Sequence, residues 1–494
     1  MGLEMEQRPE IGLPEAFTER MKRSLGENFP AFLKSYCENR YQGLRVNTLK
    51  LSSEDFLKLQ KDAFFLEPVP WCPDGFYYGI GAGEREIRPG RHVWHEAGMY
   101  YIQEPSAMSA AALLQAEPGE KVLDLCAAPG GKSTQIASSM KGEGLLVVNE
   151  IHPARAKILS QNVERMGIRN ALVCNESPES LADHFPAFFD RILCDAPCSG
   201  EGMFRKDADA VDEWSPDHVV MCADRQFSIL LEAEKMLKPG GRLVYSTCTF
   251  SEEENEEVIS RFLDACPWME ADTEMKCPHF APGKRPGVWR LWPHLLKGEG
   301  HGVAVLKKTG MAYEGTCRSE TYEKPAKISA HGKKKQNQGK AASGVIPWED
   351  GKALKLFHDW EQSTLTDAGI EHLKGDYLFF GENLYRLPPC APSLHGMKVL
   401  RPGLHVGEIK GKVFKPSHAL AMALKPEEVQ TVLEEDRTEV YRYLTGETLE
   451  CRDEKGWILL CTSGVSVGWG KAGSGIVKNH YPKGLRVNWQ ETNL

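Results

Sequence analysis

The stretch from Lys121 to Thr134, K-V-L-D-L-C-A-A-P-G-G-K-S-T, constrains the fold more than any other part of the chain. A short apolar run ends at Asp124, a turn with Pro129 and two glycines follows, and a helix-compatible run begins at Ser133. Open α/β sheets build their cofactor crevice from such a strand, turn and helix, and glycines let a ligand approach the backbone closely. The stretch matches neither the dinucleotide fingerprint nor the P-loop. Taken alone, it is equally compatible with an ordinary tight turn.

Predicted strands and helices alternate after this stretch. Strands are expected over 122–125, 145–149, 171–174, 191–194 and 242–246, with helices over 153–166 and 215–237. A final pair of segments, 288–291 and 302–307, has the pattern of antiparallel strands. Alternating β and α units predict an α/β fold, with a doubly wound, mostly parallel sheet whose last strand is antiparallel.

At 494 residues the chain exceeds a single hydrophobic core, and shifts in composition divide it. We expect an N-terminal α+β lobe over 1–95 and the α/β domain over 96–310. A flexible basic linker over 311–345 should connect them to a β-rich region over 346–494.

The formal net charge of -9 excludes nucleic-acid binding through total charge, so such binding would need local basic patches. No apolar run approaches the length of a membrane span, and the N-terminus lacks a signal-peptide core. We therefore expect a cytoplasmic protein whose 14 cysteines are reduced. They show no C-x-x-C pair and no zinc-type spacing, so we expect no metal.

One basic stretch, residues 456–490, contains no acidic residue and is interleaved with aromatic side chains. Its cationic candidates are Lys471, Lys478, His480, Lys483 and Arg486. Cations for phosphates and rings for stacking favour RNA binding, although a charge run is often only a solvated face.

Two further segments have an open interpretation. Arg45 and Asn47 share one face of a predicted strand over 43–50, where they could contact phosphate or a base or simply face solvent. The 311–345 linker is equally compatible with touching RNA and with an uninvolved tether.

Two cysteines follow neighbouring predicted strands. Cys198 lies in D-A-P-C-S-G-E-G and Cys248 in S-T-C-T-F, and both strand ends should face the cofactor crevice. Buried cysteines usually act as small hydrophobic residues, but these two enter polar turns, where a thiolate can be a nucleophile. Glu150 directly follows the strand expected over 145–149. At that position a carboxylate can accept hydrogen bonds from the two hydroxyls of a ribose.

The motifs D-L-C-A-A-P-G-G-K, D-A-P-C-S-G-E-G and S-T-C-T-F-S-x-E-E-N-E occur in order within about residues 44–307. Together they resemble the core motifs of the Nol/Nop/Sun family of RNA (cytosine-5) methyltransferases. The segments Y-Y-I-Q-E-P-S-A-M, R-L-W-P-H…G-E-G-H-G and K-N-H-Y-P-K-G-L-R look most like the bacterial RsmF type, which acts on 16S ribosomal RNA. The last of these lies in a tail that resembles a PUA-like RNA-binding module.

The resemblance implies a Rossmann-like class I methyltransferase domain that binds S-adenosylmethionine. The implied cofactor-binding residues are Cys126, Ala127, Ala128, Pro129, Gly130, Gly131, Lys132, Glu150, Arg155, Asn175, Ser177 and Asp195. Asn175 and Ser177 stand where the family usually carries an aspartate.

In the mechanism that the resemblance implies, Cys248 adds to carbon-6 of a cytosine and activates carbon-5 for methylation. Cys198 then assists release of the product, while Asp195 and Lys132 hold the base and stabilise the developing charge. The expected partner of this monomer is RNA with an unstacked base. Alternatives are transfer RNA as substrate, a DNA-type enzyme with the Pro-Cys thiol as nucleophile, and a non-catalytic ribosome-assembly factor.

Overall fold

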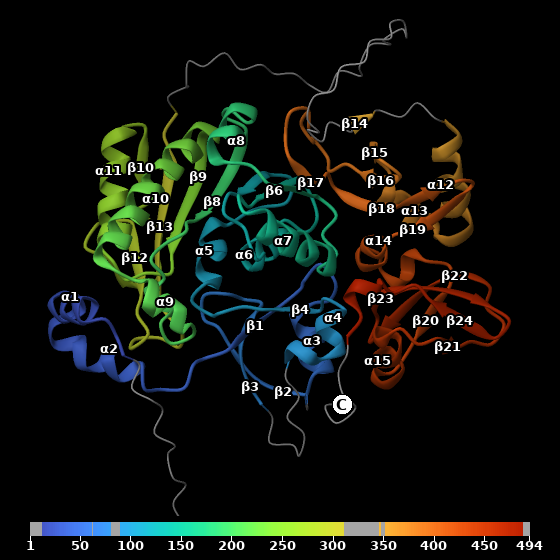
Figure 1. Ribbon diagram of the computed structural model, residues 1–494, viewed down its shortest axis with the longest axis horizontal. Helices are drawn as coiled ribbons and strands as arrows, with labels where there is room; N and C mark the ends of the chain where they lie inside the picture. Colours follow the sequence, from blue (N-terminus) through green and yellow to red (C-terminus); the bar gives the residue numbers. More distant parts are fainter. Residues whose placement is uncertain (1–11, 62, 81–88, 311–344, 347–350, 488–494) are drawn as a thin grey trace, which may run out of the picture.

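The structure is a computed structural model that describes residues 12–61, 63–80, 89–310, 345–346 and 351–487 (Figure 1). An N-terminal lobe, drawn in blue, lies against a central α/β domain, and the C-terminal region packs beside both (Figure 1). The predicted linker, 311–345, lies outside the described residues except for Val345. None of the described helices is both long and apolar enough to cross a bilayer.

The N-terminal lobe combines short helices with an antiparallel sheet in the order β2-β3-β1-β4. The strands are β1 (Gly43–Val46), β2 (Phe64–Pro68), β3 (Gly75–Ile80) and β4 (Tyr100–Ile102), and the helices α1 (Glu15–Leu25), α2 (Phe29–Ser35), α3 (Ser53–Leu59) and α4 (Val93–Glu96). Because β4 belongs to this sheet, the lobe extends past the boundary predicted at residue 95.

The central domain is built on a sheet in the order β11-β12-β13-β9-β8-β5-β6-β7-β17. Its strands are β5 (Lys121–Asp124), β6 (Leu145–Asn149), β7 (Ala171–Cys174), β8 (Phe189–Asp195), β9 (Leu237–Thr247), β11 (Ala281–Pro282), β12 (Val288–Leu291), β13 (His301–Lys308) and β17 (Val399–Arg401), and β10 (Met269–Ala271) pairs with β13. Five neighbouring strands of this sheet run parallel to one another: β7, β6, β5, β8 and β9. Strand β13 is antiparallel to β9. The predicted fold class is confirmed.

Helices cover both faces of this sheet. One face packs against α5 (Met108–Leu114), α6 (Gly131–Ser139) and α7 (Pro153–Arg165), and the other against α8 (Pro178–His184), α10 (Pro216–Met236) and α11 (Val258–Ala265). A short helix, α9 (Ala208–Glu213), precedes α10. Strand β6 is buried along its whole length, because helices lie over both of its faces, and this explains its unbroken apolar run.

The C-terminal region contains two five-stranded sheets. The first comprises β14 (Val345–Ile346), β15 (Tyr377–Phe380), β16 (Asn383–Arg386), β18 (Leu404–Lys410) and β19 (Val413–Pro416), with α12 (Gly351–Thr364), α13 (Asp367–Leu373) and α14 (His418–Ala423). The second comprises β20 (Val432–Glu434), β21 (Leu449–Glu450), β22 (Gly456–Thr462), β23 (Val465–Gly473) and β24 (Ile476–Asn479), with α15 (Arg437–Thr445). Strand β17 leaves this region and pairs with β7 of the central sheet.

Two residues predicted to contact RNA are buried where the N-terminal lobe meets the central domain. Arg45 is 1% exposed and donates a 2.6 Å hydrogen bond to the Thr134 hydroxyl. Asn47 is 0% exposed and donates to the carbonyls of Gly98 and Met166 at 2.8 and 2.9 Å. The strand face that they share is covered by the central domain, so the expected RNA contact does not fit their position.

Candidate active site

The turn after β5 is shaped by two adjacent glycines. Gly130 has φ +115°, and a Cβ there would lie 3.2 Å from Leu159 Cδ1. A Cβ on Gly131 would lie 3.2 Å from a ring carbon of Tyr101. A side chain at either position would crowd α7 or β4, so the turn over residues 126–132 keeps its backbone at the carboxyl end of β5.

Glu150 follows β6 directly and lies beside this turn. Its carboxylate accepts a 2.9 Å hydrogen bond from the His152 N–H, and the Arg155 guanidinium lies 3.4 Å from it. Arg155 also donates a 2.9 Å hydrogen bond to the Ala128 carbonyl. The structure therefore brings Glu150 and Arg155 together with the glycine turn, and their contact with a cofactor stays a prediction.

Asn175 and Ser177 shape the rim of the same region. The Asn175 amide donates to the carbonyls of Glu150 and Ile151 at 2.7 and 2.9 Å. The Ser177 hydroxyl accepts from the Ser180 N–H at 3.3 Å and caps α8. These atoms are already engaged within the protein, and a direct cofactor contact from either side chain stays a prediction.

Asp124, at the end of β5, is a candidate that the sequence analysis treated only as the end of a strand. Its Oδ2 accepts a 2.6 Å hydrogen bond from the Ser133 hydroxyl. Its Oδ1 is buried and has no hydrogen-bond partner within the described part of the chain. Burial, with a smaller effect of the nearby Asp195, raises the pKa of Asp124 to about 7. An unpaired carboxylate oxygen here can accept a hydrogen bond from an ammonium group of a ligand.

Cys198 and Cys248, 50 residues apart in the sequence, meet in space. Their sulfur atoms are 3.1 Å apart, and both side chains are partly accessible. The Gly202 N–H donates a 2.8 Å hydrogen bond to the Cys248 carbonyl, which ties one cysteine loop to the other. The hydrogen bond to Cys248, together with burial, raises the pKa of Cys198 well above its usual value. Either sulfur can donate in this contact, and the raised pKa means that Cys198 holds its proton more firmly than a free thiol does.

Asp195 lies at the meeting point of four elements. Asp195 is the last residue of β8. Its carboxylate contacts Lys132 from α6 at 2.7 Å, Ser246 from β9 at 2.7 Å and His301 from β13 at 3.5 Å. Burial alone would raise the pKa of Asp195, but Lys132 and His301 hold it well below the usual range. The pKa of Lys132 is raised overall, because the charge of Asp195 outweighs the effect of burial. The two groups form an ion pair beside the cysteines.

Glu254, a second acid that the sequence analysis missed, supports the Cys198 loop from behind. Its carboxylate accepts hydrogen bonds from the Ser199 N–H at 3.0 Å and the Gln226 amide at 2.8 Å. Sequence spacing predicts a capping box between Ser251 and Glu254. Only half of it forms: the Ser251 hydroxyl accepts from the Glu254 N–H at 3.1 Å, while the carboxylate turns toward the cysteine loop.

Glu201, three residues after Cys198, is fully buried and holds the Cys248 loop. Its carboxylate accepts from the Phe250 N–H at 3.0 Å and from the Trp214 indole at 2.9 Å. It also forms an ion pair with Arg20 of α1. Helix α1 therefore takes part in fixing the two cysteine loops.

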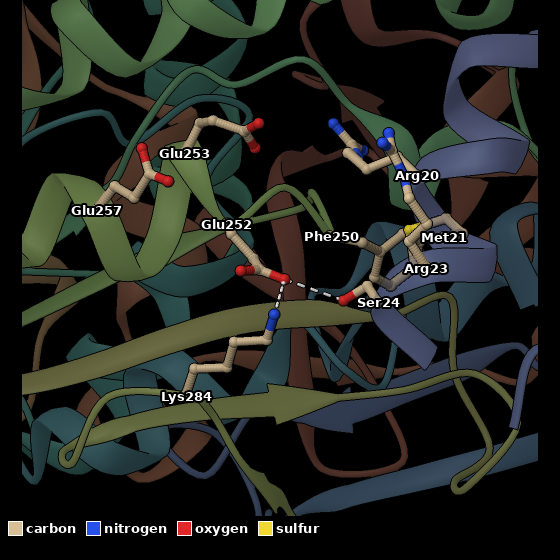
Figure 2. Close-up of a pocket in the computed structure, with 9 residues that line it drawn as sticks. All are labelled: Arg20, Met21, Arg23, Ser24, Phe250, Glu252, Glu253, Glu257 and Lys284. Atoms are coloured by element: carbon tan, nitrogen blue, oxygen red, sulfur yellow. Dashed lines mark hydrogen bonds and ion pairs between the residues drawn. The ribbon is translucent and has the colours of Figure 1, made fainter. Parts of the chain in front are cut away.

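A small cavity separates α1 from the segment that follows Cys248 (Figure 2). Across it, the Glu252 carboxylate contacts the Lys284 ammonium at 2.6 Å and the Ser24 hydroxyl at 3.0 Å (Figure 2). The cavity carries acidic and basic side chains together, so its charge does not favour phosphate. The hydrogen bond from Ser24 to Glu252 gives α1 a second attachment to the loop that follows Cys248, in addition to the one through Glu201.

Lys471, Lys478 and His480 gather on the second C-terminal sheet. Lys471 and Lys478 face each other on β23 and β24, and the Lys471 ammonium lies 5.4 Å from the centre of the Trp457 ring. His480 packs edge-on against Trp457 at 4.6 Å, and burial together with the nearby lysines lowers its pKa.

The remaining two candidates of the C-terminal patch lie further along the chain. Lys483 is exposed in the turn Lys483–Leu485, and Arg486 lies over Gly446 at the end of α15. Within the described residues, no cluster of three or more His, Cys, Asp or Glu side chains is arranged to hold a metal ion.

Comparison with known families covers most of the chain. Residues 111–307 match the family described as 16S rRNA methyltransferase RsmB/F. Residues 13–105 match the N-terminal domain of 16S rRNA methyltransferase RsmF, residues 359–424 the first C-terminal domain of RsmF rRNA methyltransferase, and residues 430–487 the methyltransferase RsmF PUA domain. The predicted PUA-like module is thereby confirmed.

Individual proteins agree with this match. Ribosomal RNA small subunit methyltransferase F of Vibrio vulnificus is 33% identical over 486 residues, which cover 96% of this chain and 98% of that protein. The protein of the same name from Serratia proteamaculans is 38% identical over 308 residues, covering 60% and 64%. The crystal structure of a methyltransferase homolog from Pyrococcus horikoshii superposes with a TM-score of 0.53 and 30% identity over 60% of this chain and 96% of that one. The chain therefore belongs to the RsmF-type family of 16S rRNA methyltransferases.

Proposed function

We propose that this protein transfers the methyl group of S-adenosylmethionine to carbon-5 of a cytidine in 16S ribosomal RNA. The observation that supports this proposal best is the 3.1 Å contact between the sulfur atoms of Cys198 and Cys248, beside the Asp195–Lys132 ion pair. Carbon-5 of cytosine is a poor nucleophile. A thiolate that adds to carbon-6 removes the aromaticity of the ring and makes carbon-5 enamine-like.

The residues around the glycine turn fit S-adenosylmethionine, which supplies the electrophilic methyl group when it is bound. Glu150 would accept hydrogen bonds from the ribose hydroxyls, because its carboxylate lies at the end of β6 beside the turn. The unpaired Oδ1 of Asp124 would accept from the ammonium group of the methionine part. The backbone over residues 126–132 would line the crevice.

Cys248 is the proposed nucleophile. With its raised pKa, Cys198 would keep its proton and donate it toward the sulfur of Cys248, which would favour the thiolate form of Cys248. As a thiolate, Cys248 would form the sulfur to carbon-6 bond with its own electron pair. Carbon-5 would then take the methyl group, and S-adenosylhomocysteine would leave with the electrons of the broken sulfur–methyl bond. Loss of the carbon-5 proton afterwards returns the electron pair to the ring and expels the Cys248 thiolate. Cys198, next to that sulfur, would assist by giving its own proton to the departing Cys248 sulfur, and the Cys198 thiolate would then take the carbon-5 proton.

The C-terminal region supports RNA as the partner. Its PUA domain match coincides with the patch formed by Lys471, Lys478 and His480 around Trp457. Cations suit the phosphate backbone, and an aromatic ring suits base stacking. The choice of ribosomal over transfer RNA follows from the RsmF-type match along nearly the whole chain.

The two thiols provide the test. With unmodified 16S RNA and S-adenosylmethionine, Cys198→Ala should add to the base, accept the methyl group and then stall. We expect a covalent protein–RNA adduct that shifts on a denaturing gel. Cys248→Ala should give no adduct, because no thiol then reaches carbon-6. The Cys198→Ala, Cys248→Ala double variant controls for reactions of other cysteines.

Three outcomes would contradict parts of the proposal. An adduct from Cys248→Ala, but none from Cys198→Ala, would exchange the roles of the two thiols, as in DNA-type enzymes. Cofactor-dependent release of tritium from carbon-5 of transfer RNA, but not of 16S RNA, would change the substrate. Absence of any tritium release from wild-type protein would favour a non-catalytic RNA-binding factor.

A further inference from the structure

His301 is the first residue of β13, and the mechanism above gives its side chain no role. Its side chain is 4% exposed, and its Nε2 lies 3.5 Å from Oδ1 of Asp195. That distance is suited to an ion pair but is long for a hydrogen bond, and Nε2 has no hydrogen-bond partner within the described residues. The other ring nitrogen, Nδ1, lies 3.3 Å from the Gly300 carbonyl. Both nitrogens thus face acceptors, and a proton on Nε2 would point at Oδ1 of Asp195.

The partners of Asp195 divide its two oxygens into different roles. A carboxylate offers about four acceptor positions, two on each oxygen. Oδ1 accepts from the Ser246 hydroxyl at 2.7 Å, and its second position faces His301. Oδ2 accepts from Lys132 at 2.7 Å and has one position left. Only Oδ2 can therefore accept from a substrate without displacing a protein donor.

We propose that His301 is a positioning residue that, with Ser246, holds Oδ1 of Asp195 and so reserves Oδ2 for the exocyclic amine of the target cytosine. This inference rests on the proposed cytosine-5 methylation and adds how the base is oriented. The amine would lie at Oδ2 beside Lys132, which fixes the orientation of the Watson–Crick edge. A carboxylate free to rotate would accept the same amine in several orientations, and misplaced reacting atoms slow the addition of Cys248 to carbon-6.

The charged and polar groups around the Asp195 carboxylate support this role of His301. Two groups lower the pKa of Asp195 against the effect of burial, and His301 is the second of them after Lys132. Asp124 and Cys126 also lie close enough to feel its charge. Since neither is a donor to Oδ1, His301 and Ser246 carry the orientation of this oxygen.

The test compares two target bases in the same RNA. One carries 5-fluorocytosine, and the other carries 5-fluoropyrimidin-2-one, which lacks the exocyclic amine. In both, fluorine replaces the proton that must leave carbon-5, so the covalent adduct accumulates and its rate of formation is measured on a denaturing gel. His301→Phe keeps the ring volume without a donor, whereas His301→Gln keeps a donor.

If His301 orients Asp195 for its contact with the exocyclic amine, His301→Phe should slow formation of the 5-fluorocytosine adduct by about 10- to 100-fold. The rate with the pyrimidinone should change much less, since that base makes no bond to Oδ2. His301→Gln should stay within about threefold of wild type for both bases, because its amide N–H can donate toward Oδ1. Affinity for S-adenosylmethionine, measured by calorimetry, should be the same in all three proteins.

The proposal would be overturned if His301→Phe slowed adduct formation equally with both bases. It would also be overturned if His301→Gln formed the 5-fluorocytosine adduct as slowly as His301→Phe. If His301→Phe does not fold, Ser246→Ala removes the other donor to Oδ1 and should show the same dependence on the amine. An equal loss for both bases in Ser246→Ala would then refute it. Wild-type protein that forms no adduct with either base would instead refute the proposed cytosine-5 methylation.

Discussion

Replacing Arg20 with methionine should destabilise the fold and slow catalysis together, although Arg20 lies far from the cysteines in the sequence. The Arg20 side chain is 21% exposed, and its partner Glu201 is 0% exposed. Methionine fills a similar volume but leaves the Glu201 carboxylate without a positive partner. The same carboxylate accepts from the Phe250 N–H, two residues after Cys248, so the Cys248 loop should loosen as well.

The structure sets the size of this effect. Removing one partner of a buried ion pair typically costs about 3–5 kcal/mol. Glu201 keeps two donors, the Trp214 indole and the Phe250 N–H, so we expect a smaller cost of about 2–3 kcal/mol. The matched control is Arg261→Met, which breaks a pair with Asp224 in which both side chains are exposed, by 47% and 63%. Such a pair contributes about 0–1 kcal/mol.

Urea unfolding of the two variants and the wild type, together with kcat on 16S RNA, checks this reasoning. Arg20→Met should unfold at a clearly lower urea midpoint than Arg261→Met and should show reduced kcat. Affinity for S-adenosylmethionine should not change, because the turn over residues 126–132 does not depend on Glu201. Coinciding midpoints of the two variants would show that burial of Glu201 does not make the Arg20 contact strong. A lower midpoint with unchanged kcat would show that α1 does not control the Cys248 loop.

Three further variants test other parts of the protein. Glu150→Ala should weaken S-adenosylmethionine binding by about 1–3 kcal/mol, measured by calorimetry, and unchanged affinity would remove Glu150 from the ribose site. Asp124 has a folded-state pKa raised to about 7, so its contribution to stability declines as the pH rises from about 4 through 7. Asp124→Asn should therefore raise the thermal midpoint of the cofactor-free protein more at pH 8 than at pH 5, and an equal effect at both would contradict the raised pKa. Replacing Lys471 and Lys478 with glutamine should reduce the slope of log RNA affinity against log salt by about 1–2, whereas an unaltered slope would show a merely solvated face.

The positions of the central strands along the chain and the meeting of the cysteines could be predicted from the sequence. The expected strands over 145–149, 171–174 and 288–291 match β6, β7 and β12 residue for residue. Strands covered on both faces carry continuous apolar runs, which are visible without knowledge of their neighbours. The carboxyl ends of parallel strands lie at one edge of the sheet, so the loops after β8 and β9 had to come together.

Contacts between segments that are distant in the sequence could not be predicted in this way. The alternation of Arg45 and Asn47 identified a shared strand face, but local spacing cannot say whether solvent or another domain lies over it. In the same way, nothing in the residues of α1 shows that Arg20 would pair with Glu201, 181 positions later. Strand β17 had no local signal that would assign it to the edge of the central sheet. Each of these contacts forms only when distant segments pack.

By itself, the sequence determined the α/β order, the glycine turn and the two thiols, because each depends on a local pattern or on a rule of parallel sheets. Only the tertiary structure decided that His301 joins Asp195. Strand β13 runs antiparallel to β9, so its amino end arrives at the edge where the parallel strands have their carboxyl ends. The Gly302–Thr247 pairing therefore places His301 next to the loop of Cys248. Strand direction, which a single strand does not encode, brings this residue into the site.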